Sequence, residues 1–189
     1  MLDIVAHAQR AYPPRTYENA GCAQLTIALA LDYETAGERL TRRAAGDRYL
    51  ALPLTDAPLT SARRLWWTLT DLGLDPTAGR PVLNIAGNGI YSLAKAGWTQ
   101  AALNAHLHAI LTPVHQHIGL SLVVSGGQTG IDLAGGIAAH ALGIPVRMTL
   151  PAGFLQRGVD HRDIERTEAE IRAEVIAAAD VLSRVAVPT

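Results

Sequence analysis

Two short glycine turns hold the residue types with the clearest potential for chemistry. The first glycine turn is Gly87-Asn88-Gly89, and the second is Ser125-Gly126-Gly127-Gln128-Thr129-Gly130. Adjacent glycines permit positive φ angles and leave backbone N–H groups uncovered. Where such a turn leads into a helix, these N–H groups and the helix N-terminus attract an anion such as a phosphate. The second turn therefore predicts an anion-binding loop.

Polar side chains in and after the second turn could contact the rest of a ligand. Ser125 and Thr129 offer hydroxyl groups, and the Gln128 amide could read a sugar or a base edge. Asp132 could accept hydrogen bonds from ribose hydroxyls, or it could only stabilise its own helix N-terminus. Both interpretations of Asp132 stay open. The glycine spacing matches neither a Walker motif nor a Rossmann dinucleotide fingerprint.

Four histidines in one segment, at positions 106, 108, 115 and 117, could suggest a metal site. On a helix, a spacing of two puts residues on different faces, and His108 and His115, which share a face, lie about 10 Å apart along the axis. We therefore interpret them as a polar helix face and predict no metal site.

A dense polar loop follows the strand expected at 144–150. Arg157 or Arg162 could bind a phosphate there, and His161 could act as an acid or base. The alternative is a solvated loop. The arginines at 39, 42 and 43 are interpreted as a solvated helix face.

Both glycine turns follow apolar strands in a chain where strands and helices alternate. We expect strands over 24–31, 49–54, 81–86, 120–124 and 144–150, and helices over 36–45, 59–72, 90–95, 100–115, 130–142 and 164–182. The alternation predicts an α/β, Rossmann-like three-layer fold with a mostly parallel central sheet. In such sheets, ligands bind beyond the carboxyl ends of the strands, where both turns would lie.

The loop over residues 75–80 is the best candidate for an internal boundary. Residues 76–189 would form the ligand-binding core, and residues 1–75 a β-α-β-α elaboration packed on or joined to the sheet. Residues 1–23 show no clear element, and we expect Pro13 and Pro14 to break regular structure there.

Composition and charge exclude several classes of protein. The 189 residues have a formal net charge of −1, so no global basic field attracts nucleic acid or an anionic membrane. Cys22 is the only cysteine, so no intrachain disulfide can form. With no signal peptide and no apolar run of about 18 residues, we expect a cytoplasmic protein without a membrane partner.

The octapeptide from Ser125 to Asp132 resembles a known family. Ser-Gly-Gly-Gln-Thr-Gly-Ile-Asp is similar to the mark of the YpsA-like and molybdenum-carrier branch of the SLOG superfamily, and DprA-type proteins have a related sequence. The order of elements from Pro81 to Arg166 is also similar. Ala152 replaces a lysine of the molybdenum-carrier branch. The catalytic glutamate of LOG-type phosphoribohydrolases has no counterpart after the second turn.

The resemblance implies a Rossmann-like domain that binds nucleotides or nucleotide-derived molecules. We expect a homo-oligomeric protein, with no cofactor, that senses or sequesters a nucleotide-derived, phosphate-bearing small molecule. The alternatives are a LOG-type hydrolase of nucleoside phosphates or N-glycosidic bonds with Asp132 as its base, a DprA-like nucleic-acid-processing protein, and a molybdenum-cofactor carrier. The predicted ligand-binding residues are Gly87, Asn88, Gly89, Ser125, Gly126, Gly127, Gln128, Thr129, Gly130, Asp132 and Arg157.

Overall fold

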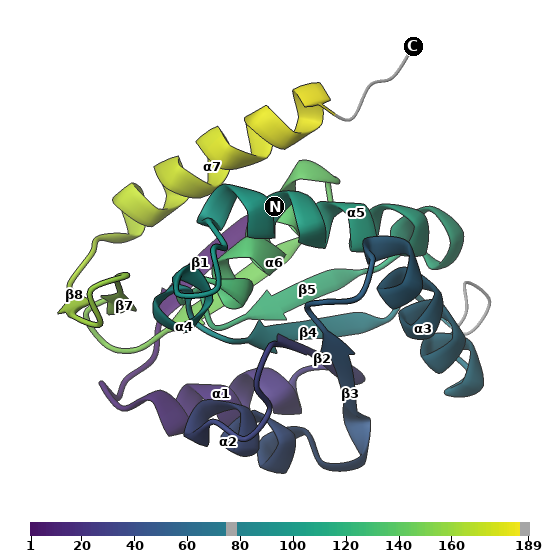
Figure 1. Cartoon of the computed structure of the whole chain (residues 1–189), viewed down its shortest axis with the longest axis horizontal. Coiled ribbons are helices and arrows are strands. Elements are labelled where there is room, and N and C mark those ends of the chain that lie inside the picture. The colour runs from purple at the N-terminus through teal and green to yellow at the C-terminus, as the bar shows by residue number, and fades with distance from the viewer. Residues whose placement is uncertain (75–78, 186–189) are drawn as a thin grey trace.

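The computed structural model, which describes residues 1–74 and 79–185, is built around a six-stranded sheet (Figure 1). The strand order is β1-β6-β5-β4-β2-β3, and every pairing within this sheet is parallel. The strands are β1 (Leu2–Ala6), β2 (Leu25–Ala30), β3 (Tyr49–Pro53), β4 (Val82–Gly87), β5 (Leu122–Ser125) and β6 (Val146–Leu150). The predicted α/β, Rossmann-like class is confirmed.

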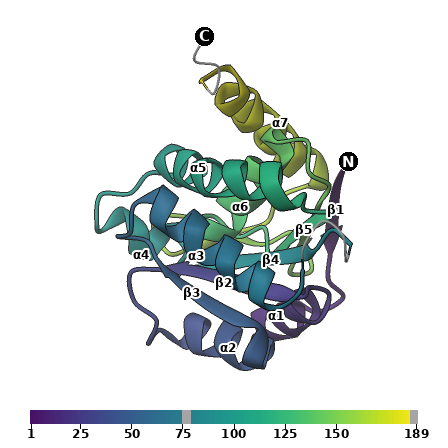
Figure 2. The same cartoon turned by 90° about the vertical axis from the view of Figure 1, so that its right-hand side faces the viewer.

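Helices cover both faces of the sheet (Figures 1 and 2). One face holds α1 (Tyr12–Gly21) and α2 (Ala36–Ala45), which pack against each other. The other face holds α3 (Pro58–Asp71), α5 (Gln100–Ile118) and α6 (Ile131–Ala141), with α7 (Glu168–Val185) packed on α6. The short elements are η1 (Gly46–Arg48) and α4 (Ile90–Ala94). None of the helices in the described ranges combines the length and apolar character that crossing a bilayer requires.

The handedness of the connections explains which helix lies on which face. Crossovers between parallel strands are right-handed in nearly all proteins. Connections that move the chain toward the β3 edge therefore use the α1/α2 face, and those that move it back use the opposite face. The neighbours β2 and β4 consequently send their following segments to opposite faces, and this reversal opens a crevice at their carboxyl ends.

Local sequence signals account for most of the observed boundaries. Helix α2 spans the predicted residues 36–45: the Thr35 hydroxyl accepts a hydrogen bond from Glu38 N at 3.2 Å, and Gly46 ends the helix at φ +58°. The other predicted strands and helices are confirmed to within about four residues. Thr99 likewise caps α5, with its hydroxyl 3.1 Å from Ala102 N.

The N-terminal segment corrects the sequence interpretation. Residues 1–23 contain β1 and the whole of α1, and Pro13 and Pro14 lie in the first turn of that helix. The prediction that these prolines break regular structure is wrong, because first-turn N–H groups have no partner within the helix and proline loses nothing there.

The segment before residue 75 shares one sheet with the rest of the chain. Strand β1 pairs with β6, and β2 pairs with β4. Their fully buried side chains, such as Ile27 and Ile85, belong to the same apolar core. Most of the boundary loop predicted at 75–80 lies outside the described residues.

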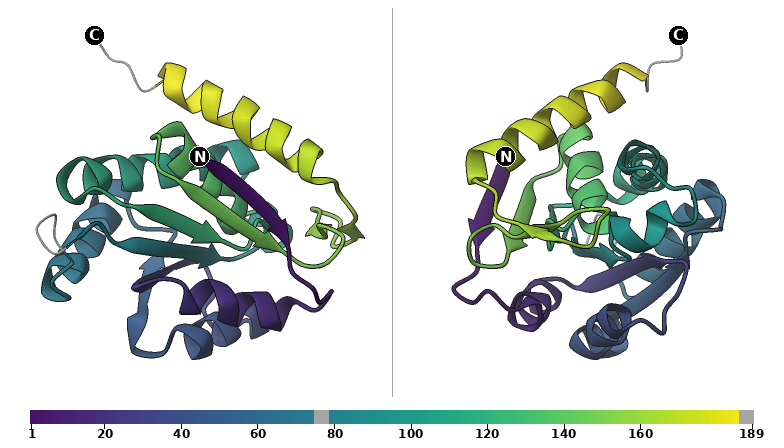
Figure 3. Two further views of the ribbon diagram at one scale, coloured as in Figure 1. Left: turned by 180° about the vertical axis from the view of Figure 1, so that it is seen from behind. Right: turned by 60° about the vertical axis from the view of Figure 1, so that its left-hand side comes forward.

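A small antiparallel hairpin replaces the polar loop expected after β6. It consists of β7 (Gln156–Arg157) and β8 (Asp163–Ile164). Figure 3 shows it beyond the carboxyl ends of the central strands, beside the glycine turns.

Candidate functional site

A cavity of about 610 Å³ lies at the carboxyl edge of the sheet, at the strand reversal between β2 and β4. Helices α1 and α2 form one side of it, and β4 with the two glycine turns forms the other. Its volume is within the range of roughly 300–1,000 Å³ that is usual for small-molecule sites. The predicted site residues that line it are Gly87, Gly89, Gly126, Gln128, Thr129, Asp132 and Arg157.

The predicted residues Asn88 and Ser125 have structural roles instead. The Asn88 side chain is 6% exposed, and its oxygen accepts hydrogen bonds from the backbone that follows β2, 2.9 Å from Leu31 N. Its Nδ2 donates to Glu38 Oε1 at 3.2 Å. The fully buried Ser125 hydroxyl accepts from Gly127 N within its own turn. Neither side chain lines the cavity.

At three positions of the glycine turns, close packing of neighbouring protein atoms explains why the residue is glycine. A Cβ added at Gly87 would overlap the backbone of β2. At Gly127 (φ +65°) it would lie 2.7 Å from a Leu150 methyl carbon, and at Gly130 (φ +104°) 2.6 Å from the Asn88 carbonyl oxygen. Gly127 and Gly130 therefore allow the turn to pack closely on Leu150 and on the first glycine turn, and they do not line the cavity.

Backbone N–H groups around the second glycine turn are engaged by the protein itself. Gly130 N donates to Gln100 Oε1 at 2.7 Å, and Ile131 N donates to the Asn88 carbonyl at 3.2 Å. The Asp132 carboxylate also lies beside this turn. The N–H groups of Gly130 and Ile131 are therefore already paired, and phosphate binding to the amides of this turn stays a prediction.

Gln128 and Thr129 hold the hairpin against the glycine turn. Gln128 Nε2 donates to the Leu155 carbonyl at 2.6 Å, and its Oε1 accepts from Arg157 N at 2.9 Å. The Thr129 hydroxyl donates to the Arg157 carbonyl. Both ends of the Gln128 amide are thus occupied, so the predicted reading of a ligand edge by this amide does not fit its contacts.

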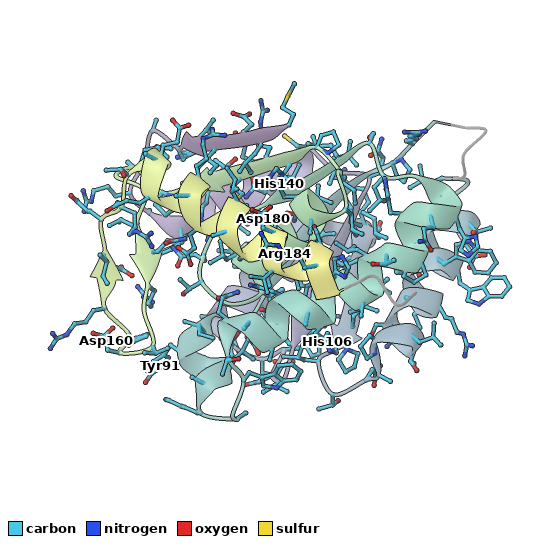
Figure 4. All side chains as sticks on the ribbon, turned by 90° about the horizontal axis from the view of Figure 1, so that it is seen from above. Tyr91, His106, His140, Asp160, Asp180 and Arg184 are labelled. Atoms are coloured by element: carbon cyan, nitrogen blue, oxygen red, sulfur yellow. The ribbon has the colours of Figure 1, made fainter. Side chains whose placement is uncertain are left out.

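The hairpin itself is tied together by charge and aromatic contacts. Arg157 donates twice to Asp163, at 2.8 and 3.0 Å, and holds the pKa of that carboxyl below its usual range. The ring of His161 lies 4.1 Å from that of Tyr91, centroid to centroid. Figure 4 shows Tyr91 beside the hairpin tip that bears Asp160. Arg157 lines the cavity, while His161 faces α4.

A buried ion pair between α1 and α6 is the main feature that the sequence did not predict. Arg15 Nη1 lies 3.4 Å from Asp132 Oδ2, and both side chains are about nine-tenths buried. The guanidinium group lies against Gly126, where any Cβ would displace it. Burial raises the pKa of Asp132, and the positive charge of Arg15 opposes that rise.

Glu38 places a second buried carboxyl in the same cavity. The side chain is 3% exposed, and Asn88 donates to Oε1. Burial, followed by the nearby charge of Asp132, raises the pKa of Glu38 to about 8. Thr35 and Glu38 have the sequence spacing of a capping box, in which the glutamate carboxyl bonds back to the start of the helix. Here the backbone N–H of Glu38 bonds to Thr35, whereas its carboxyl group accepts from Asn88 and lines the cavity.

Hydrogen-bonding atoms without a protein partner are concentrated at this cavity. Six buried side-chain atoms in the described part of the chain have no such partner, and three of them belong to cavity residues: Arg15 Nε, Asn19 Oδ1 and Glu38 Oε2. A buried polar group left unpaired costs about 1–3 kcal/mol. Their gathering in one place makes this cavity the candidate site for a polar ligand.

Two arginines lie at the mouth of the cavity. Arg39 and Arg43 are exposed residues of α2 that line it, whereas Arg42 is exposed and does not. The interpretation of these arginines as a solvated face agrees with the exposure of all three, but Arg39 and Arg43 also line the cavity.

The pH dependence of stability should reveal the buried Glu38 carboxyl. A folded-state pKa of about 8, above the usual 4.5, means that folding takes up a proton at pH values between these two. The contribution of Glu38 to the free energy of unfolding should therefore fall as the pH rises from about 4.5 to 8. We expect Glu38→Gln to remove this slope, so that its stability relative to the wild type grows between pH 5 and pH 8. Urea unfolding measures the difference, and parallel curves would contradict the assignment.

The histidines of α5 do not form a metal site with their neighbours. His115 Nδ1 accepts a hydrogen bond from Leu120 N, which ends the helix. Within residues 1–74 and 79–185, no three His, Cys, Asp or Glu side chains are arranged to hold a metal ion.

Comparison with known proteins adds no family to this description. No protein-family model matches the chain, and no curated protein matches it. The site is therefore interpreted from its own geometry.

Proposed function

We propose that this chain binds a nucleotide-derived, phosphate-bearing small molecule in the cavity between α1, α2 and the glycine turns. One observation carries the proposal: the cavity combines exposed arginines at its mouth with buried, unpartnered hydrogen-bonding atoms at its inner end. A phosphorylated sugar or nucleotide has the complementary layout, with the charge at one end and neutral polar groups at the other.

The arginines at the mouth supply the phosphate site. Neither Arg39 nor Arg43 pairs with a carboxylate anywhere in the described ranges. Guanidinium groups bind phosphate oxygens in pairs, and Arg157 lies on the opposite side of the same cavity. These contacts support a phosphate site at α2 rather than on the amides of the second glycine turn.

Aromatic rings and the ion pair supply the remaining contacts. Tyr12 and Tyr91 both line the cavity and offer ring surface to a base. Asp132, expected at the ribose, acts here mainly by neutralising Arg15.

A hydrolase is the second candidate, and one observation favours it. Two buried carboxyls with different surroundings share the cavity: Asp132 forms an ion pair with Arg15, and Glu38 forms none within residues 1–74 and 79–185. Such pairs divide the roles of base and acid in hydrolytic enzymes.

A thermal-shift screen tests the proposal and separates the two candidates. With AMP, GMP, ADP and ADP-ribose as probes, we expect at least one to raise Tm by mass action. Mass spectrometry of each mixture then tells binding from cleavage.

The same screen has a matched pair of variants on one helix. Arg43→Ala should weaken binding about tenfold or more, since a charge-assisted hydrogen bond contributes about 1.5–3 kcal/mol. Arg42→Ala, one residue away but outside the cavity, should bind like the wild type. Equal losses in both variants, or no shift with any probe, would refute the proposal.

Membership of the SLOG superfamily, a homo-oligomeric state and a cytoplasmic location remain predictions. The octapeptide and the parallel sheet support the first of these. Exposed apolar side chains on α3 and at its end, such as Leu59, Trp67 and Leu72, support the second.

A further inference from the structure

The inner wall of the cavity, formed by Arg15, Asn19 and Glu38, has a composition of its own. These residues are 7%, 3% and 3% exposed, yet each has one polar atom without a hydrogen-bond partner in the described part of the chain. Arg15 and Asn19 lie one turn apart on α1, and Glu38 comes from α2, which packs against α1.

This wall carries no net charge available to a ligand. The Arg15 guanidinium is already paired with Asp132 at 3.4 Å. Glu38 has no cation of its own in the described part of the chain, and its pKa of about 8 keeps it protonated at neutral pH. A phosphate or carboxylate placed here would face Asp132 without a free counter-charge.

The unpartnered atoms define what the wall can bind. Arg15 Nε–H donates a hydrogen bond, and Asn19 Oδ1 accepts one. Since Glu38 Oε1 accepts from Asn88, the acidic proton is held on Oε2, which therefore donates. A group that meets all three atoms must both donate and accept hydrogen bonds.

We propose that the inner wall binds an uncharged group that donates and accepts hydrogen bonds, either sugar hydroxyls or the amide-type edge of a base, and that Glu38 selects it as a hydrogen-bond donor. This inference rests on the proposed function and deepens it. The arginines at the mouth hold the phosphate, and the inner wall decides what the phosphate is attached to.

The proton on Glu38 should make binding depend on pH. The titratable and charged groups around Glu38 are Asp132 on α6, Asp32 after β2, the tyrosines at 33 and 49, and Arg15 on α1. Both carboxylates disfavour ionisation of Glu38. As the pH rises above 8, Oε2 loses its proton, and the donor to the ligand is lost.

Calorimetric titrations with four probes test the inference: inorganic phosphate, ribose 5-phosphate, AMP and 2′,3′-dideoxy-AMP. For the wild type, we expect AMP to bind more tightly than inorganic phosphate and its affinity to fall about tenfold or more between pH 7 and pH 9.5. Glu38→Gln keeps a neutral donor, so it should bind AMP within about threefold of the wild type at pH 7 and lose the fall. Glu38→Leu should bind at least about tenfold more weakly at both pH values. Melting curves of the free variants establish that each is folded.

The probes separate the two sources of the group. If ribose 5-phosphate binds like AMP, the wall takes sugar hydroxyls; if dideoxy-AMP binds like AMP and ribose 5-phosphate does not, it takes the base. Inorganic phosphate binding as tightly as AMP would overturn the inference and leave the phosphate site at the mouth intact, as would a folded Glu38→Leu variant that binds AMP like the wild type. If no probe binds the wild type, the proposed function fails, and the inference fails with it.

Discussion

Gly87→Ala should destabilise the protein by about 3 kcal/mol or more, a large value for a single added methyl group. The new Cβ would overlap the Leu29 carbonyl oxygen of β2 and lie 2.8 Å from Ile131 Cγ2 of α6. The Leu29 carbonyl is backbone in a central strand and accepts a hydrogen bond from Asn88 N at 3.2 Å. Strand β2 cannot move away from the new Cβ without breaking its hydrogen bonds to β4. Any shift that removes the overlap therefore costs stability. Chemical denaturation of the two proteins measures the loss.

Gly89→Ala is the matched control in the same turn. The nearest atom to its added Cβ is the Thr129 carbonyl oxygen at 3.7 Å, an ordinary contact, and its φ of −71° suits any residue. We expect its stability to stay within about 0.5 kcal/mol of the wild type. If both variants unfold at the same denaturant concentration, β4 does not approach β2 as closely at Gly87 as described.

Arg15→Met should destabilise the protein by about 3–5 kcal/mol at neutral pH, because it leaves a buried carboxylate without its cation. Asp132 would then face only Glu38 and its own backbone hydrogen bond from Gly87. The loss should shrink as the pH is lowered, since protonation of Asp132 removes the uncompensated charge. Urea unfolding at pH 5 and pH 8 measures both effects.

Two further variants isolate the buried pair. Arg10→Met breaks the Arg10–Glu165 pair, which is just as direct at 2.8 Å but about 60% exposed at each side chain, and should cost no more than about 1 kcal/mol. Adding Asp132→Asn to Arg15→Met should recover much of the lost stability, because no charge is then buried alone. If the two losses simply add, the pair does not interact as described.

Local sequence signals were sufficient for five of the six strands of the sheet and for the edge at which the cavity lies. Apolar strands alternating with capped helices predicted the parallel α/β fold, because strand burial, helix caps and glycine ends are set by neighbouring residues. The two glycine turns were also expected at the carboxyl ends of strands, and both line the cavity. The same reasoning missed β1 and α1. It missed α1 because two prolines that begin a helix resemble two prolines that prevent one.

The roles of the site residues depended on contacts that no local pattern contains. Asp132 meets Arg15 across 117 positions of sequence, and Glu38 meets Asn88 across 50. Helices α1 and α2 lie on one face of the sheet, and α6 lies on the other. The partners meet because residues from both sides reach the same cavity at the carboxyl edge of the sheet. The backbone N–H groups of Gly130 and Ile131, where the second glycine turn enters α6, bond to Gln100 and Asn88, which are distant in sequence.

The sequence by itself thus determined the fold class, most elements and the edge of the sheet where a ligand would bind. Only the tertiary structure decided which side chains form the inner wall and which arginines lie at the mouth. The physical reason is one of range: helix periodicity, caps and turns act over a few residues. Burial of Glu38 and pairing of Arg15 follow instead from the strand order, which brings distant segments to one crevice.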